Sequence, residues 1–170
     1  MSTTPTNNNF FNPQNFKFIL KRAPNVEFFI QEISTPDLSF PSLEIGNPFV
    51  PIKEQVTHLQ YSPLAIVFKL DENLQNYNEI YDWINRRGFP TNPAQYKSIS
   101  SRKKETGTWL DSDITISIEN SLHKAVAEIT LVDAHPIHLG GFHFNTTDNE
   151  VNFISTAATF EFTYLTFSVL

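Results

Sequence analysis

One helical segment stands in a sequence whose other patterns predict β-strands. It follows the strand pattern of Ser62–Leu70 and covers about residues 73–87, ending in two arginines, Gly88 and Pro90. Glycine just past a helix and proline soon after it are typical of a helix end. The apolar face that we expect to pack on a sheet comprises Leu74, Tyr77, Ile80, Tyr81 and Ile84. A chain of this kind has to fold around a sheet, with the helix at one flank.

Strand patterns account for most of the remaining chain. Sixteen phenylalanines and only five glycines favour an aromatic-rich β core. Four prolines interrupt residues 35–58, so we expect only turns and short edge strands there, at Leu43–Ile45 and Phe49–Lys53. Longer strands are expected at Phe16–Ala23, Val26–Ser34, Asp113–Asn120, Lys124–Ala134 and Ser155–Leu170. The predicted fold is α+β and mainly β: an antiparallel β-barrel or sandwich with one flanking helix.

The 170 residues predict one domain preceded by an arm. Residues 1–15 are polar and rich in Asn and Thr, which predicts a flexible N-terminal arm, and residues 16–170 form the domain. The first residues lack the charged and apolar regions of a secretory signal. No apolar run approaches the roughly 18 residues of a membrane span. We therefore expect a chain made in the cytoplasm, with no membrane partner.

Charge is distributed unevenly. The net charge is −6, which does not favour general nucleic-acid binding. A long loop is predicted at 88–112. Residues 86–104, which cover the end of the helix and most of this loop, contain six of the twelve Lys and Arg residues and no Asp or Glu. The loop could be merely solvated, or it could dock on an acidic surface of a sister subunit. The candidate interface residues are Arg86, Arg87, Lys97, Arg102, Lys103, Lys104 and Trp109.

The sequence offers little for catalysis or metal binding. His135, His138 and His143 could serve zinc, but no carboxylate shares a tight pattern with them, so three ordinary histidines are the simpler interpretation. Cysteine is absent, and no nucleophile elbow or phosphate-binding loop occurs. Asp111 and Asp113 lie by a loop, where a solvated pair is the ordinary interpretation. We expect no cofactor and no enzymatic activity.

Aromatic residues leave one binding hypothesis open. Trp83, Trp109 and Tyr96 could stack on a sugar in a carbohydrate-binding β-sandwich. A packed tryptophan on the helix and another tryptophan anchoring the loop are the alternative interpretation. A hydrolase with an unrecognised site is a further alternative.

Two motifs carry a family resemblance. One is the strand-to-helix step Val67–Trp83, "VFKLDENLQNYNEIYDW", and the other is the "DAHPIHL" stretch Asp133–Leu139. Together with the element order over about residues 16–168, they resemble the tail tube fold of contractile-tailed bacteriophages and related injection systems. The resemblance implies a non-enzymatic subunit whose strands join those of its neighbours into six-fold rings that stack around a lumen. It also implies a sheath or baseplate around the tube, and tape-measure protein and DNA passing through it.

These implications define the expected function. We expect a virion structural protein that forms hexameric rings of a phage tail tube, the conduit for genome ejection, and that resides in the tail after synthesis in the host cytoplasm. The helix would cover the outer face of the sheet, the loop at 88–112 would reach another subunit, and an acidic lumen would repel DNA. The Asn-rich arm and the Pro-rich segment depart from a minimal tube subunit. They keep a tail completion protein or a baseplate tube initiator open as alternatives.

Overall fold

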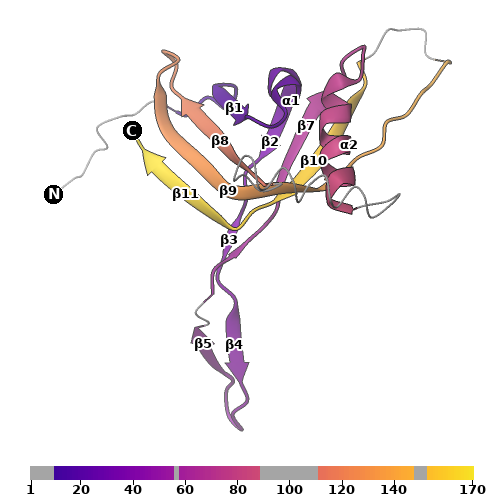
Figure 1. The fold of residues 1–170 in the computed structure, drawn as a ribbon. Coiled ribbons are helices and arrows are strands. Elements are labelled where there is room, and N and C mark those ends of the chain that lie inside the picture. The colour runs from indigo at the N-terminus through magenta and orange to yellow at the C-terminus, as the bar shows by residue number, and fades with distance from the viewer. Residues whose placement is uncertain (1–9, 56–57, 89–110, 148–152) are drawn as a thin grey trace, which may run out of the picture.

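A long bent strand, β9 (Ala125–Leu139), joins two half-sheets in the computed structural model (Figure 1). The structure describes residues 10–55, 58–88, 111–147 and 153–170. The first part of β9 pairs with β8 and β11, and its second part pairs with β10. The strand order is β1-β8-β9-β10-β7-β2, with β11 beside β9, and every pairing is antiparallel. The bounds are β1 (Phe16–Leu20), β2 (Ile30–Ser34), β7 (Leu64–Lys69), β8 (Ser112–Glu119), β10 (Ser155–Glu161) and β11 (Tyr164–Val169).

The bend in β9 is a β-bulge at Asp133. This residue has φ +55, and the pairing of β9 with β8 shifts between Ser112 and Ile114. The Asp133 N–H donates to Oδ1 of Asp113 at 3.1 Å. A bulge bends its strand and leaves a backbone group without a ladder partner, and the Asp113 carboxylate supplies that partner. Asp113 is therefore a structural residue.

The core fills the space between the two half-sheets. Alternate side chains of each strand turn inward, as the period of a strand requires. Leu64, Ile66 and Phe68 of β7 are all fully buried. They meet Phe18, Leu20, Ile114, Ile116, Ile129, Leu131, Ala158 and Phe160 from the other strands. The predicted mainly β, antiparallel fold is confirmed, and within this single chain the described sheet stays open.

The segment expected as one strand at Val26–Ser34 was wrongly predicted in its first half. Helix α1 (Pro24–Phe29) occupies it, and β2 follows directly. Proline at the first helical position already has helical φ. Glu79 of the second helix accepts hydrogen bonds from the Asn25 N–H at 3.2 Å and from its side-chain amide at 2.7 Å. These contacts from outside the segment outweigh the strand preference of its two phenylalanines.

The expected central helix is confirmed as α2 (Gln75–Gly88). Ile80 and Trp83 are buried in the core, and Ile84 packs partly against it. Tyr77 lies against Phe142 in an edge-to-face pair, with ring centroids 5.1 Å apart.

Two residues of the predicted packing face were wrongly assigned. Leu74 precedes the helix with φ +55, and its side chain is exposed, as is that of Tyr81. The helix begins later than the apolar spacing suggested. The buried face is therefore centred on Ile80 and Trp83, and Tyr81 is turned toward solvent.

The Pro-rich segment forms a two-stranded arm. β3 (Leu38–Ser39) pairs with β6 (Gln60–Tyr61), and β4 (Ser42–Ile45) pairs with β5 (Ile52–Gln55). The expected strand at Leu43–Ile45 is present, whereas the one expected at Phe49–Lys53 lies later in the chain. Figure 1 shows this arm projecting away from the half-sheets. The prediction of a single closing strand at Ser155–Leu170 was wrong, because this segment forms two strands, β10 and β11.

Asn76 provides a test of the junction between β7 and α2. It is fully buried, its Nδ2 donates to the Lys69 carbonyl at 2.7 Å, and its Oδ1 accepts from the Asp71 N–H at 3.3 Å. Asn76→Ala leaves both backbone groups unpaired, so we expect a loss of about 1–3 kcal/mol in the free energy of unfolding by urea denaturation. Asn78→Ala, at an exposed position on the same helix, is the control and should change it by less than about 0.5 kcal/mol. Equal effects of the two variants would contradict this role of Asn76.

Candidate assembly surfaces

The arm has one apolar and one polar face. Ile45 lies opposite Ile52, and Leu43 lies on the same face of the hairpin. All three side chains are exposed. Glu44 and Lys53 face each other on the other side, 3.8 Å apart. A two-stranded hairpin is marginally stable alone, and an uncovered apolar face is typical of an interaction surface.

The tip of the arm extends the apolar surface. Phe49 is 92% exposed and Val50 is also exposed. Glu54, opposite Leu43, adds a charge at the other end of the apolar face. We call Leu43, Ile45, Phe49, Val50 and Ile52 the arm surface.

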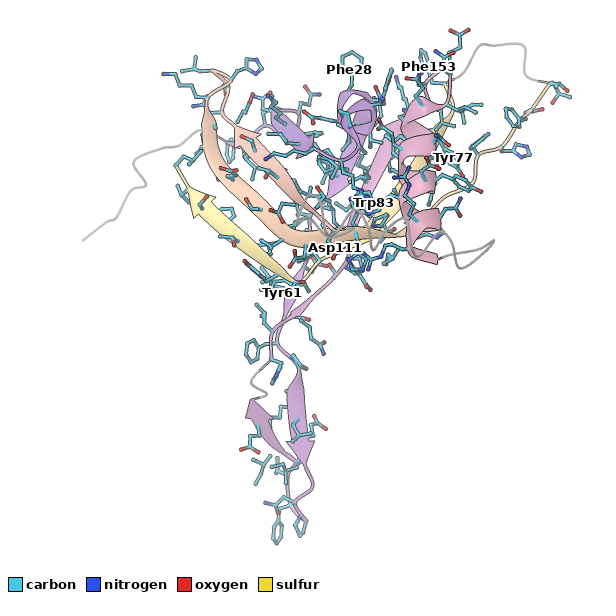
Figure 2. All side chains as sticks on the ribbon, viewed as in Figure 1. Phe28, Tyr61, Tyr77, Trp83, Asp111 and Phe153 are labelled. Atoms are coloured by element: carbon cyan, nitrogen blue, oxygen red, sulfur yellow. The ribbon has the colours of Figure 1, made fainter. Side chains whose placement is uncertain are left out.

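The root of the arm is fixed to the body. The Tyr61 ring packs on Phe162 with centroids 5.4 Å apart, and the Asp37 N–H donates to Ser62 Oγ at 2.7 Å. A cavity of about 320 Å³ lies at this root, lined by Tyr61, Ser62, Pro63, His135, Glu161, Phe162 and Thr163. The arm therefore leaves the body at a packed junction. In Figure 2, Tyr61 lies where the arm meets the half-sheets.

A charged cluster borders that junction. Arg87 at the end of α2 forms an ion pair with Asp111. Oδ1 of Asp111 lies 3.7 Å from Nδ1 of His135, and Nε2 of His135 lies 4.0 Å from Glu161. The cluster ties the end of α2 to β9 and β10, so Asp111, like Asp113, has a structural partner.

We call the half-sheet formed by β1, β8, the first part of β9 and β11 the larger half-sheet, and its two edge strands pair with no further strand among the described residues. β1 pairs only with β8, and β11 pairs only with β9. The six residues of β11, Tyr164–Val169, include no charge and no proline. Charges and prolines are the usual protection of an edge against pairing with another chain. The β11 edge lacks that protection.

The predicted basic interface is only partly within the described structure. Arg86 pairs with Asp82 at 3.7 Å along α2, and Arg87 is held by Asp111. The other five predicted interface residues, Lys97, Arg102, Lys103, Lys104 and Trp109, lie outside the described residues, as does Tyr96. Their role in an interface stays a prediction.

Among the described residues, those considered for metal or sugar binding do not form a site. His138 and His143 are exposed and His135 is half-buried, and no group of His, Asp and Glu in the described part of the chain could hold a metal ion. Trp83 is buried against Phe160, with ring centroids 6.0 Å apart, and so cannot stack on a sugar. None of the helices in the described ranges has the length and apolar character needed to cross a membrane.

The arm surface was missed by sequence analysis, although a signal was present. Apolar and polar residues alternate at Leu43–Ile45, and Ile52 is an apolar residue before the polar run Lys53–Gln55. The prolines were interpreted as limits on strand length. They are equally compatible with a two-stranded hairpin that has no neighbouring strands, because an edge can lack a backbone donor.

The fold matches solved tube and cap proteins. No family model and no curated protein matches the sequence. The anti-feeding prophage cap (AFP tube terminating cap) aligns with a TM-score of 0.68 at 16% identity, over 98% of this chain and 96% of that one. A chain of the PVC sheath-tube complex, an extracellular contractile injection system in the extended state, aligns with a TM-score of 0.66 at 16% identity, over 99% of this chain and 100% of that one. Hcp1 from Flavobacterium johnsoniae aligns with a TM-score of 0.51 at 10% identity, over 89% of this chain and 93% of that one.

These likenesses define the structural class. The chain has the fold of contractile injection system tube and cap proteins, which is the fold that the sequence motifs resembled.

Tyr61 tests the attachment of the arm. Tyr61→Ala removes the ring contact with Phe162, a pair of a kind worth about 0.5–1.5 kcal/mol. We expect trypsin or chymotrypsin to cleave within the arm several-fold faster, while the body stays folded by circular dichroism. Tyr81→Ala, which removes an exposed ring from α2, is the matched control and should leave arm cleavage unchanged. An unchanged cleavage rate in Tyr61→Ala would show that the ring pair does not hold the arm.

Proposed function

We propose that this chain is a non-enzymatic subunit that assembles with copies of itself into stacked rings, forming the tube of a contractile tail or injection system. Six copies per ring is the number that the family resemblance implies. The tube would be a conduit, surrounded by a sheath and joined to a baseplate. Its location would be the assembled particle, after synthesis in a host cytoplasm.

The observation that carries this proposal is the uncovered arm surface. The arm extends from the body on a packed root, yet Leu43, Ile45 and Ile52 have no partner surface in the described chain. Fully burying one such side chain is worth about 1.5–3 kcal/mol. A projecting apolar hairpin of this kind is suited to dock on another copy, and stacked rings supply such a copy. The unprotected β11 edge, together with the β1 edge that pairs only with β8, supports lateral joining in the same assembly.

The occupant of the conduit defines two versions of the proposal. In a tailed virion the lumen would carry the tape-measure protein and then the genome. In an injection system without a genome it would carry protein. The likeness to the AFP and PVC particles supports the second version as much as the first.

A terminal ring is the second candidate function. It is favoured by the likeness to a tube-terminating cap, with a TM-score of 0.68. A tube subunit would form stacks of variable length, whereas a cap would form single rings that stop the growth of a tube. Negative-stain imaging of the purified protein at increasing concentration separates these two outcomes.

Native mass spectrometry with negative-stain imaging tests the proposal itself. Closed rings, alone or stacked, are the expected result. A chain that stays monomeric at all concentrations, with and without preformed tube ends from a related particle, would refute it.

Changing the arm surface tests its role in stacking. The triple variant Leu43→Asn, Ile45→Asn, Ile52→Asn keeps strand length but removes the apolar face, so we expect stacked rings to be lost. Glu44→Gln with Lys53→Gln is the matched control, because an exposed ion pair contributes only about 0–1 kcal/mol. The control should stack as the unchanged protein does. Stacking by the triple variant would remove the arm from the proposal.

A further inference from the structure

The core of the larger half-sheet is incomplete at one edge. One inward-facing row of side chains runs across four strands: Phe18, Ile116, Ile129 and Phe167. The exposed fraction along this row is 2%, 2%, 8% and then 58%. In the adjacent row, Ala127 is buried while its partner Val169 is 73% exposed. The inward face of β11 thus carries apolar side chains that no described residue covers.

The opposite edge of the same half-sheet carries a second uncovered aromatic residue. The Leu20 N–H donates to Glu27 of α1 at 3.3 Å, so α1 lies at the outer edge of β1. Val26 is buried in the core, which places α1 on the inward side of that strand. Phe28 lies two residues on, about 200° around a helix from Val26, and is 82% exposed. Figure 2 shows Phe28 at the top of α1, away from the half-sheets.

We infer that Phe28 of one copy completes the core above Phe167 and Val169 of the next copy. This inference rests on the proposed function and assigns the side-chain contact at the lateral joint. The uncovered apolar groups lie at opposite edges of one sheet and on the same side of it. Joining β11 of one copy to β1 of another would therefore bring them together. Such a contact is heterologous, and repetition of a heterologous contact closes a ring when the rotation allows it.

Strand direction and charge agree with this joint. Three antiparallel pairings lead from β1 through β8 and β9 to β11. Because each pairing reverses the strand direction, β1 and β11 run in opposite directions. The two edges can therefore pair as antiparallel strands over the part of β1 that precedes Leu20, whose N–H already donates to α1. On the outward face, one row contains Lys17, Ser117, Glu128 and Ser168. With the rows in register, the joint places Lys17 of one copy two strands, or about 10 Å of backbone separation, from Glu128 of the next.

That charge arrangement favours a second copy as the occupant of the β11 edge. β11 has no charge of its own, and the only charge on β1 is Lys17, whose nearest acidic neighbour across the joint would be Glu128. Opposite charges at this spacing fix orientation more than they add affinity. The apolar contact of Phe28 would supply most of the affinity, as a central aromatic residue does in many interfaces.

Cross-linking tests the contact directly, because the chain contains no cysteine. In the double variant Phe28→Cys with Phe167→Cys, a short bismaleimide should link copies into a ladder ending at the ring size. An equal mixture of the two single variants should stop at dimers. Phe28→Cys with Phe144→Cys is the control, since Phe144 is also exposed but lies on the segment after β9, and it should give no ladder.

Charge exchange distinguishes a contact from mere proximity. Phe28→Lys and Phe167→Glu should each raise the protein concentration at half-assembly by about tenfold or more, while circular dichroism of the monomer stays unchanged. Combining them should restore assembly toward that of the unchanged protein. If the unchanged protein forms rings but no ladder appears, and both single variants assemble normally, the contact is refuted and the proposed function stands. If the unchanged protein forms no rings, the proposed function itself fails.

Discussion

The bulge in β9 is the constraint on which the arrangement depends. A single strand supplies the partner for β8 and β11 in its first part and for β10 in its second part. It can do so only because the backbone turns at Asp133, where φ is +55 and the Asp113 carboxylate accepts the N–H. The bend creates the enclosed side on which the core and both helices lie. It leaves the other side of the larger half-sheet lined by residues such as Lys17, Thr130 and Glu128.

The sequence predicted those features that depend on local pattern. The strand Leu64–Lys69, the hairpin of β8 and β9 and the helix α2 follow from residue spacing and from Gly88 and Pro90. The helix α1 could not be predicted in this way, because Phe28 and Phe29 favour strands and the contact that fixes α1 comes from Glu79, 54 residues beyond Asn25. Leu74 was misplaced for a related reason: apolar spacing does not reveal where helical φ begins.

The candidate surfaces depended still more on long-range structure. Exposure of Leu43, Ile45 and Ile52 cannot be recognised until the hairpin is seen to leave the body. The exposed state of Phe167 depends on how far α1 and α2 reach across the sheet. The basic residues Arg86 and Arg87 illustrate the converse case, since their charges suggested an interface and both have acidic partners within the chain.

The two different edges of the larger half-sheet have a consequence for the order of assembly. If copies join edge to edge as proposed, every open chain of joined copies, whatever its length, would still present one free β1 edge and one free β11 edge. Each intermediate would then remain as reactive as a single subunit, and closure alone would remove both ends at once. Partial rings should accordingly be short-lived and rare beside monomers and complete rings. The same property would favour aggregation at a high concentration of unassembled subunits, because the unprotected β11 edge can pair with an exposed strand of another chain.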